Sequence, residues 1–562
     1  MTADARAALP AAGTGPTPWS RLIGLGSVFG KTLRDSRRAI ALVGLLSGFL
    51  MLVSGAGLAA QFGSAASRLQ LVAQAQLLPV ALRGLLGEPI AVETLGGFLS
   101  WRIGNTLPAM LGIWSVLALS GTLAGEAAKG SLDVLVAAPV SRRLIAAQKL
   151  LAHVTGVAVA MSFAALITAV TGAAFGTLPG DAIPLGAAAG HFLLTGLLVL
   201  FAGAVAFALG PVVGRGRALG LGLVVLFATY LVPAYASVSP VIEALEPLSP
   251  FSWTAGHRPL AGRSDWLPVG ALGAVTAGLA TLGLFTFERR DLGRAASLGW
   301  LRLPSLPAGT RNPFVRQLAD RLGAAIGWGL GIGLYGATIA ASAAAFSAGM
   351  AQLPQIRAMV ERIYPGVDIT APSGVLQLAF FPFGSLLAGL GAATFVGGWA
   401  GDESNRRLDL VLSTPTGRVP WALASALGVL AAVLAMVALG GAVIGIAVAN
   451  QGGDAATPLI GLGVLALYGA AVAGVGLAVG GLLRADLAAP VAGGIVIGSY
   501  LLELVGTILR APDWLLQVSL NHHFGQPMAG RFDTGGLALF AVLAVGGVAV
   551  GLLGLRRRDL RR

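Results

Sequence analysis

The sequence contains no cysteine and very little charge. Only 11% of its 562 residues are Asp, Glu, Lys or Arg, whereas a soluble globular protein typically has about 25%. Without cysteine, neither a disulfide framework nor a thiolate metal site can form. The five histidines are scattered, apart from His522 and His523, and show no metal-ligand spacing. These absences exclude a disulfide-stapled protein and a thiolate metal centre, and the low charge is not that of a soluble domain.

Long apolar runs dominate the chain instead. Hydrophobic residues make up 56% of it, with a mean hydropathy of +0.82, and several runs exceed the roughly 18 residues that mark a transmembrane helix. Backbone groups in lipid must be satisfied internally, and the period-two alternation of a barrel is absent. We therefore predict an all-α polytopic membrane protein. Its twelve transmembrane helices are expected at residues 39–60, 106–125, 150–175, 184–210, 218–236, 266–287, 323–345, 377–400, 422–449, 458–483, 488–509 and 535–555.

The distribution of positive charge predicts the orientation. An even number of spans puts both termini on one side, and the segments on that side hold most of the 37 Lys and Arg residues. Positive residues accumulate in cytoplasmic loops, so both termini are expected in the cytoplasm. The same bias explains the net charge of +13 without nucleic acid, because no basic stretch is interleaved with aromatic residues.

An internal repeat divides the chain into two halves. Arg289-Arg290-Asp291-Leu292 recurs as Arg557-Arg558-Asp559-Leu560, and the Pro-x-Ala-Gly-Arg-x-Asp stretch at 259–265 recurs at 527–533. Leu132-Asp133 recurs as Leu408-Asp409, and Leu33-Arg34-Asp35 resembles Leu318-Ala319-Asp320. Each half has six spans, so both have the same orientation and form a parallel repeat. The expected organisation is a cytoplasmic N-terminal segment with an interfacial helix (1–38), a first six-span half (39–287), a cytoplasmic linker with an interfacial helix (288–322), a second six-span half (323–555) and a basic cytoplasmic tail (556–562).

The loop after the second span of each half has the pattern of a short amphipathic helix. Apolar residues lie on one helical face because their spacing is i, i+3 and i+4, and a proline ends each helix. The loops begin with acidic residues, which favour a helix N-terminus. The residues concerned are Glu126, Leu132, Asp133, Leu135, Val136 and Pro139 in the first half and Asp402, Glu403, Leu408, Asp409, Val411, Leu412 and Pro415 in the second.

These helices could lie on lipid or dock in a groove on a partner. Asp133 and Asp409 argue against an anionic lipid surface, and occurrence in both halves argues for two equivalent partners. We favour docking. The copies differ, since Asp402-Glu403 replaces Glu126-Ala127 and Arg406-Arg407 replaces Lys129-Gly130, so unequal coupling at the two sites is expected.

Ionisable groups within the spans are few. His191 lies in the fourth span and Glu503 in the eleventh, and both are candidates for a polar pathway because a charge in the bilayer is costly. The alternative for His191 is a neutral, hydrogen-bonded histidine at a helix contact, and Glu503 is near enough to the boundary to reach water. The chain of acids typical of a proton-driven pump is missing. The long external segments 61–105 and 346–376 suit re-entrant or interfacial helices.

The combined pattern resembles the ABC-2 type permeases, most closely the fused actinobacterial exporters of the tetronasin-resistance type. The likeness rests on the two six-span halves, the loops LDVLVAAPVSRR and LDLVLSTPTGR, and FERRDLG after the sixth span. It implies a non-catalytic permease without its own cofactor, two copies of a separate ATPase that bind ATP and Mg, and export of amphiphilic or apolar drug-like molecules from a bacterial cell through its plasma membrane. The loop helices would be the coupling helices, with Glu126, Leu132, Asp133, Pro139, Asp402, Leu408, Asp409 and Pro415 at the docking sites.

Two other functions remain open. An ion-gradient-driven secondary transporter would need buried acids or unwound helices at mid-membrane, and the acids are absent. A non-transporting scaffold or sensor would need no path between the halves. No hydrophilic stretch is long enough for a nucleotide-binding domain, so any ATP must be bound by another chain.

Overall fold

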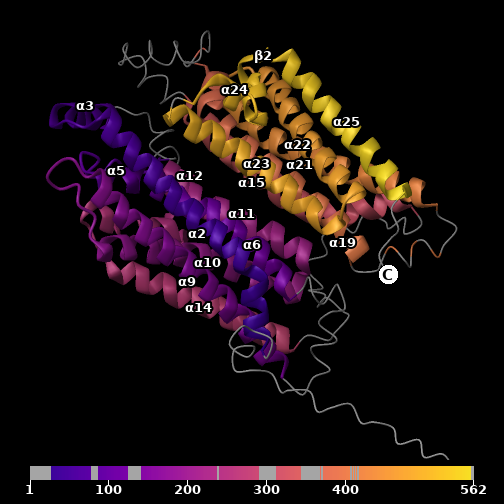
Figure 1. Cartoon of the computed structure of the whole chain (residues 1–562), viewed down its shortest axis with the longest axis horizontal. Helices are drawn as coiled ribbons and strands as arrows, with labels where there is room; N and C mark the ends of the chain where they lie inside the picture. Colours follow the sequence, from indigo (N-terminus) through magenta and orange to yellow (C-terminus); the bar gives the residue numbers. More distant parts are fainter. Residues whose placement is uncertain are drawn as a thin grey trace, which may run out of the picture.

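The structure is an almost wholly helical bundle (Figure 1). The computed structural model describes residues 27–76, 86–123, 141–236, 240–289, 312–343, 368, 371–404, 408, 411, 413, 417–509 and 511–557. Within these residues the only paired strands are β1 (Gly525–Gln526) and β2 (Arg531–Phe532), an antiparallel ribbon.

The twelve predicted spans are all present. Eleven helices are long and apolar enough to cross a membrane, and the twelfth span is a helix pair bent by 44° between Gly104 and Leu107. In the first half the spans are α2 (Val28–Gln61), the bent pair α5 (Leu95–Leu99) with η1 (Ser100–Gly104) and α6 (Leu107–Thr122), α9 (Arg142–Phe175), α10 (Leu185–Val213), α11 (Arg215–Tyr235) and α14 (Trp266–Glu288). In the second half they are α15 (Pro313–Ala341), α18 (Pro372–Val375) with η5 (Leu376–Phe380) and α19 (Phe381–Ser404), α21 (Arg418–Asn450), α22 (Ala456–Leu482), α23 (Ala485–Leu509) and α25 (Thr534–Arg557).

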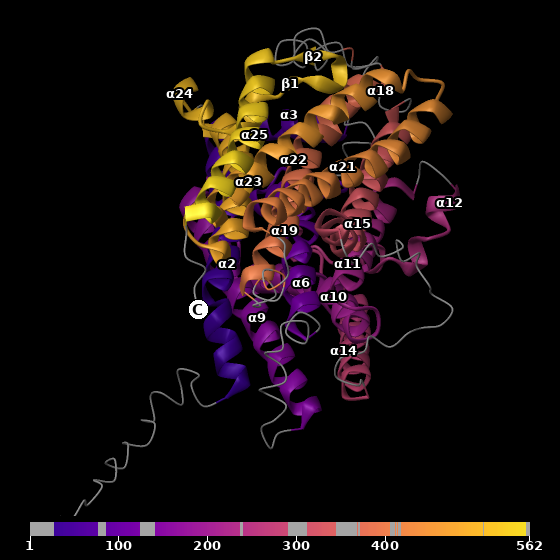
Figure 2. The same cartoon turned by 90° about the vertical axis from the view of Figure 1, so that its right-hand side faces the viewer.

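Short elements cover one end of the bundle. They are α3 (Ala65–Gln76), α12 (Pro240–Glu243), η3 (Glu246–Leu248), α13 (Pro250–Trp253), η4 (Pro259–Ala261), α24 (Asp513–Leu516), η6 (Leu520–His523) and η7 (Pro527–Ala529). We call this end, which also carries β1 and β2, the distal end. The opposite end, where α2 begins and α25 finishes, is the terminal end (Figures 1 and 2).

The predicted interfacial helices differ from the structure in the part that is described. Residues 28–38 are the start of α2, which runs unbroken for 34 residues from a cap at Ser27. At 1.5 Å per residue this helix is about 50 Å long, well beyond a hydrocarbon core of about 30 Å. Residues 313–322 likewise begin α15, capped by Asn312. The amphipathic pattern was correct for a helix but could not show that the helix continues into the span.

Equivalent contacts show that the sequence repeat is a structural repeat. A side chain at Gly44 or Gly48 of α2 would meet Ala160 or Ile167 of α9. A side chain at Gly329 or Gly333 of α15 would meet Met436 or Val443 of α21. The sequence alignment of the halves pairs the first two glycines with the second two, and it pairs their contact partners in the same way.

The distal ends repeat the same backbone turns. Each Pro-x-Ala-Gly-Arg-x-Asp stretch forms a 3-10 turn, closed by Gly262 at φ 74° in one half and Gly530 at φ 73° in the other. Glycine suits this left-handed conformation because it has no Cβ. The Ser249 hydroxyl donates to the Thr229 carbonyl at 2.5 Å, and the Ser519 hydroxyl donates to the Ser499 carbonyl at 3.0 Å.

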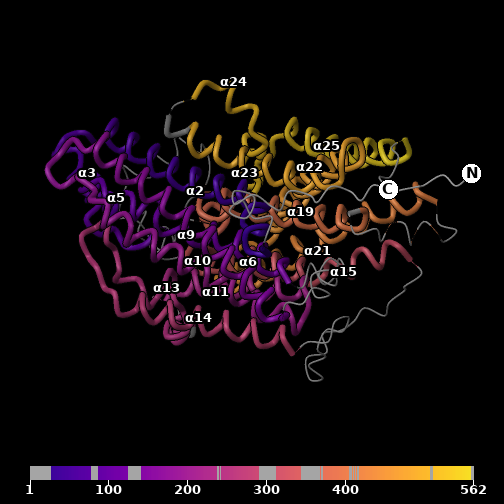
Figure 3. Tube along the Cα trace, turned by 60° about the horizontal axis from the view of Figure 1, so that its bottom comes forward, coloured from indigo at the N-terminus to yellow at the C-terminus, as the bar shows by residue number. Residues whose placement is uncertain are grey.

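The halves meet chiefly where α11 of the first packs along α15 of the second, and a buried hydrophobic cluster runs through this contact. Gly216 and Gly220 of α11 face Gly323 and Gly327 of α15, so the two backbones approach closely. Small residues at i and i+4 permit such contacts between membrane helices. The equivalent pair, α23 and α2, also lies side by side (Figure 3) but touches far less.

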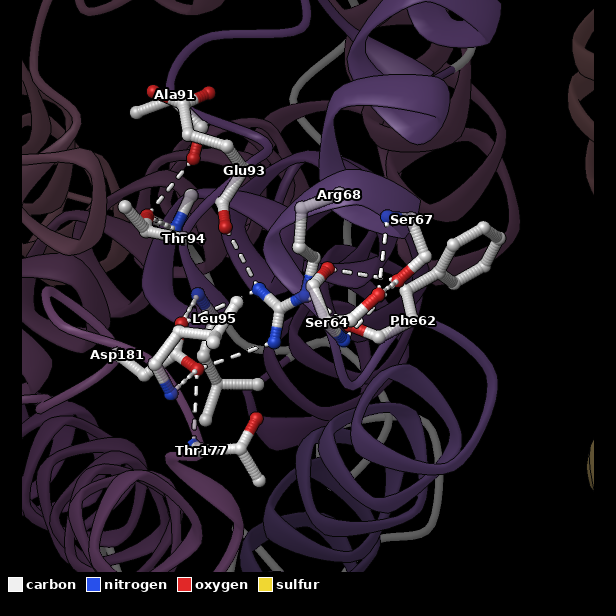
Figure 4. Close-up of polar contacts among 12 residues, drawn as sticks. Phe62, Ser64, Ser67, Arg68, Ala91, Glu93, Thr94, Leu95, Thr177 and Asp181 are labelled. Carbon is white, nitrogen blue, oxygen red and sulfur yellow. Dashed lines mark hydrogen bonds and ion pairs between the residues drawn. The ribbon is translucent and has the colours of Figure 1, made fainter.

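A buried ion pair holds the distal end of the first half together (Figure 4). Arg68 of α3 and Asp181, in the loop before α10, are 2% and 1% exposed, and their closest charged atoms are 3.1 Å apart. The Arg68 guanidinium also donates to the Phe62 and Glu93 carbonyls. Asp181 accepts backbone N–H bonds from Leu95 at 2.8 Å and from Leu178 at 3.0 Å. The pair therefore fastens α3, the start of the bent span and the loop before α10 to one another.

Replacing Asp181 by Asn should destabilise the protein. The substitution leaves the Arg68 charge buried and unpaired, which typically costs about 3–5 kcal/mol. We expect a lower midpoint of thermal unfolding in detergent. Asp454, in the matching Gly-Asp-Ala stretch of the second half, is exposed. Asp454→Asn is therefore the control, and an equal effect of both variants would contradict the role assigned to the ion pair.

The ion pair also gives stability a pH dependence. Burial acts to raise the pKa of Asp181, but the backbone N–H groups of Leu95 and Leu178 and the Arg68 charge outweigh it and lower this pKa below its ordinary value. The stabilisation is complete above the unfolded-state pKa of about 3.9. It is lost as the pH falls through the lower pKa of the folded protein, and Asp181→Asn should remove this acid-side loss.

A second stability test concerns the contact between the halves. A Cβ at Gly327 would overlap the backbone of Gly220, so Gly327→Leu must push α15 away from α11. Overpacking of this kind costs about 1–3 kcal/mol. The control is Gly463→Leu in α22, where no atom lies within 4 Å of the added Cβ. Thermal unfolding should show a loss for Gly327→Leu only, and equal midpoints would argue against a tight contact.

Candidate coupling region and polar groups in the spans

The predicted coupling loops lie partly outside the described residues. Every residue predicted for docking in the first loop falls outside them: Glu126, Leu132, Asp133, Leu135 and Pro139. In the second loop, Asp409, Leu412 and Pro415 are outside, whereas Asp402, Glu403 and Leu408 are described. The structure therefore describes residues of the predicted coupling region only in the second half.

Asp402 and Glu403 belong to the last turn of α19, at the terminal end of the bundle. The sequence predicted them at the start of a loop helix, where the helix dipole favours acids. At the end of a helix the dipole disfavours them. Asp402 has a compensating partner, because the side-chain amide of Gln317 on α15 donates a hydrogen bond to its carboxylate.

Gln317 and Arg321 join α15 to α19 through buried hydrogen bonds. These two side chains are 3% and 4% exposed. Arg321 donates through Nη1 to the Gln317 backbone carbonyl at 2.7 Å and to its side-chain oxygen. It donates through Nε to the Phe395 carbonyl of α19 at 3.0 Å. These bonds join α15 to the helix that leads into the second loop, while Nη2 of Arg321 is buried without a partner among the described residues.

Leu408 is turned toward the permease itself. It is 3% exposed and belongs to the same buried cluster as Trp399 and Trp421, and Val411 packs against that cluster. The prediction placed this apolar face in a groove of a partner. In the structure its two described members, Leu408 and Val411, pack against the chain's own buried cluster instead.

His191 lies inside the first half between α10 and the bent span. It is 5% exposed, its ring packs edge-on to Phe192, and a Cβ at Gly104 would come within 2.6 Å of its Cε1 and Nε2 atoms. Among the described residues Nε2 has no hydrogen-bond partner. The alternative expected a hydrogen-bonded His191, and the described residues provide no such bond at Nε2. The ring fills space at the bend, and a part in a polar pathway stays a prediction.

Glu503 reaches the surface at the distal end of α23. Its side chain is 39% exposed, and its Oε1 atom lies 3.7 Å from Nδ1 of His522. Its contact with water and its part in a polar pathway stay predictions. The described residues contain no group of three or more His, Cys, Asp or Glu that could hold a metal ion.

A π-helical turn follows the first short α-helix of the second span in each half and was not predicted. The two turns, η1 and η5, occupy equivalent positions in the alignment of the halves. Such turns are frequent at functional sites. Arg102 lies on η1.

Comparison with known proteins identifies the class of protein. Residues 27–292 match a family described as ABC-2 family transporter protein, and residues 312–556 match the C-terminal domain of the multidrug efflux system permease Rv1217c. The multidrug efflux system permease protein Rv1217c of Mycobacterium tuberculosis is 27% identical over 503 residues, which cover 86% of this chain and 85% of that relative.

The bundle and these matches define a multi-pass membrane permease, since each matched region contains one half of the repeat. The chain belongs to the ABC-2 family and is the permease subunit of an ABC exporter. Membership in this family implies a partner ABC ATPase. The resemblance noted in the sequence is thereby confirmed at the level of the family.

The buried link at the terminal end can be tested by Gln317→Leu. This variant removes the donor to Asp402 and an acceptor of Arg321, and an unsatisfied buried polar group costs about 1–3 kcal/mol. We expect a lower midpoint of thermal unfolding. Arg316→Leu, at an exposed neighbouring position of α15, is the control. A Gln317→Leu variant as stable as this control would show that the network contributes nothing.

Proposed function

We propose that this permease exports amphiphilic or apolar small molecules, and that two copies of a separate ATPase dock on its two repeated loops. The observation that carries the proposal is the duplication itself. Two equivalent six-span halves carry the repeated loop sequences that begin at Glu126 and Asp402. Two docking sites of the same kind require two copies of the same partner. ATP and Mg are bound by that partner, and this chain catalyses no covalent step.

The substrate class follows from the lining that the chain can offer. The spans consist mainly of Leu, Val, Ala, Gly and Phe, so a path between them favours molecules with an apolar body. The name of the mycobacterial relative, a multidrug efflux permease, agrees with that class. The chain lies in a bacterial plasma membrane, and the bias of positive residues favours a terminal end that faces the cytoplasm.

The ATPase proposal is tested by purifying the tagged chain from its native host in mild detergent. An ATPase chain should copurify at two copies per permease, measured by native mass spectrometry. Asp133→Lys combined with Asp409→Lys should abolish its recovery and the efflux of a lipophilic dye such as rhodamine 6G. The control is Asp35→Lys, an exposed acid of α2 that pairs with Lys31.

Three outcomes are informative. Recovery of no nucleotide-binding chain would overturn the proposal. One copy per permease would overturn the two-site arrangement alone. If both association and efflux survive the double reversal, the docking residues are assigned wrongly.

A further inference from the structure

The two contacts between the halves are built from equivalent helices. The first seam joins α11 to α15, and the second seam joins α23 to α2. The repeat pairs Asp35 of α2 with Asp320 of α15, and it pairs Tyr230 of α11 with Tyr500 of α23. Counting along the helices from these pairs gives each residue in one seam a counterpart in the other. The two seams can therefore be compared position by position.

The first seam is closed by glycine. A Cβ at Gly220 would lie 2.5 Å from the Gly323 carbonyl oxygen, and one at Gly331 would lie 2.5 Å from the Phe227 ring. The helices touch backbone to backbone, so neither can slide or tilt far without losing the contact.

The second seam has bulky or charged residues where the first has glycine. The counterparts of Gly216 and Gly220 are Asp486 and Pro490, and those of Gly323 and Gly327 are Arg38 and Leu42. All four are exposed, and the Leu42 side chain is 56% exposed. The equivalent close approach is therefore absent over this part of the seam.

The exposed face of α23 continues along the helix. Asp486, Pro490, Gly494 and Gly498 recur at every fourth position and all are exposed, so they lie on one face. No atom lies within 4 Å of a Cβ placed at Gly494 or Gly498. Helix α2 exposes Leu45 and Phe49 beyond Leu42. The glycine contact of the first seam thus has no counterpart at these exposed positions of α23 and α2.

The second seam closes only toward the distal end. Leu501, Leu504 and Val505 of α23 pack against the hydrophobic cluster of the first half, which includes Leu50, Met51 and Leu58 of α2. The separation of α2 and α23 thus widens toward the terminal end, which holds Arg38 and Asp486. At that end the Gln317 network also fastens α19 to α15, a helix of the closed seam.

We propose that the closed α11–α15 seam is a fixed hinge and that α2 and α23 form the moving gate, which admits the apolar body of a membrane-dissolved substrate. The inference rests on the proposed export function. When the ATPases close, the second half turns about the glycine contact, and the exposed faces of α2 and α23 come together as their counterparts already do. In the closed state the exposed face of α2 packs against the exposed face of α23. Before closure, the substrate body occupies the space between these two faces.

Engineered cysteine pairs can test the hinge and the gate separately, because the chain has no cysteine of its own. A Cβ at Gly323 would lie 3.4 Å from the backbone nitrogen of Arg217 and 3.5 Å from its Cγ, so these two positions are direct neighbours across the first seam. The hinge pair is therefore Arg217→Cys with Gly323→Cys. Its counterpart by the repeat, Leu487→Cys with Arg38→Cys, is the gate pair. Phe227→Cys with Gly331→Cys replaces the hinge pair if that variant does not fold.

The variants are studied with their ATPase in proteoliposomes. The hinge pair should crosslink equally with and without ATP, and rhodamine 6G transport should persist after oxidation. The gate pair should crosslink at least tenfold faster in the ATP-and-vanadate-trapped state, and oxidation should stop transport until dithiothreitol is added. Single-cysteine variants control for each substitution.

Several results would overturn the inference. Transport blocked by the hinge crosslink would mean that the first seam must move. A gate pair that crosslinks at the same rate in all states would mean that the second seam does not move with the cycle, and one that never crosslinks would mean that the gap holds lipid only. The crosslinking rates are measured by gel electrophoresis, so they remain informative even if rhodamine 6G is not exported. Failure of the ATPase to copurify would contradict the proposed function instead.

Discussion

The close approach of α11 and α15 is the contact on which the rest of the structure depends. Twelve helices in lipid gain no hydrophobic driving force from one another, so their association rests on packing and on interhelical polar contacts. Glycine at positions 216, 220, 323 and 327 lets two backbones meet across the boundary of the duplicated halves. One continuous buried cluster then runs from the first half into the second. Without this contact the two six-span units would share little more than the distal end of α23.

The spans could be predicted because their cause is local. A run of about twenty apolar residues is sufficient for a membrane helix, and each predicted run is a helix in the structure. The start of the second span was misplaced because Arg102 and Asn105 interrupt its hydropathy, so the span was expected from residue 106 although its helix begins at Leu95. The sequence also did not predict that one helix continues from Val28 past the expected boundary at residue 38, because an amphipathic pattern and an apolar pattern can follow one another within a single helix.

Long-range polar contacts were beyond sequence reasoning. Arg68 and Asp181 are 113 positions apart, and no periodicity links them. A weak signal existed in Gly180-Asp181-Ala182, which recurs as Gly453-Asp454-Ala455. The structure shows that the recurrence does not fix the role, because the Asp181 carboxylate is buried in an ion pair, whereas the exposed Asp454 carboxylate accepts a backbone N–H bond from Ala456 at the start of α22. The same holds for Leu408. Its helical spacing predicted an apolar face, but the sequence could not show whether that face packs against a partner or against the chain itself.

The repeat matters most where the halves differ. Duplication gives two copies of each contact, and a symmetric machine would keep both seams alike. Here Gly220 and Gly327 meet in one seam while Pro490 and Leu42, their counterparts, stand exposed in the other. A single chain allows this divergence, because a change at Leu42 leaves Gly327 untouched, whereas in a homodimer it would alter both seams. Fusion of the halves is therefore what permits one seam to specialise as a hinge. The retained fold supplies equivalent helices, and the side chains at four paired positions decide which pair of helices can separate.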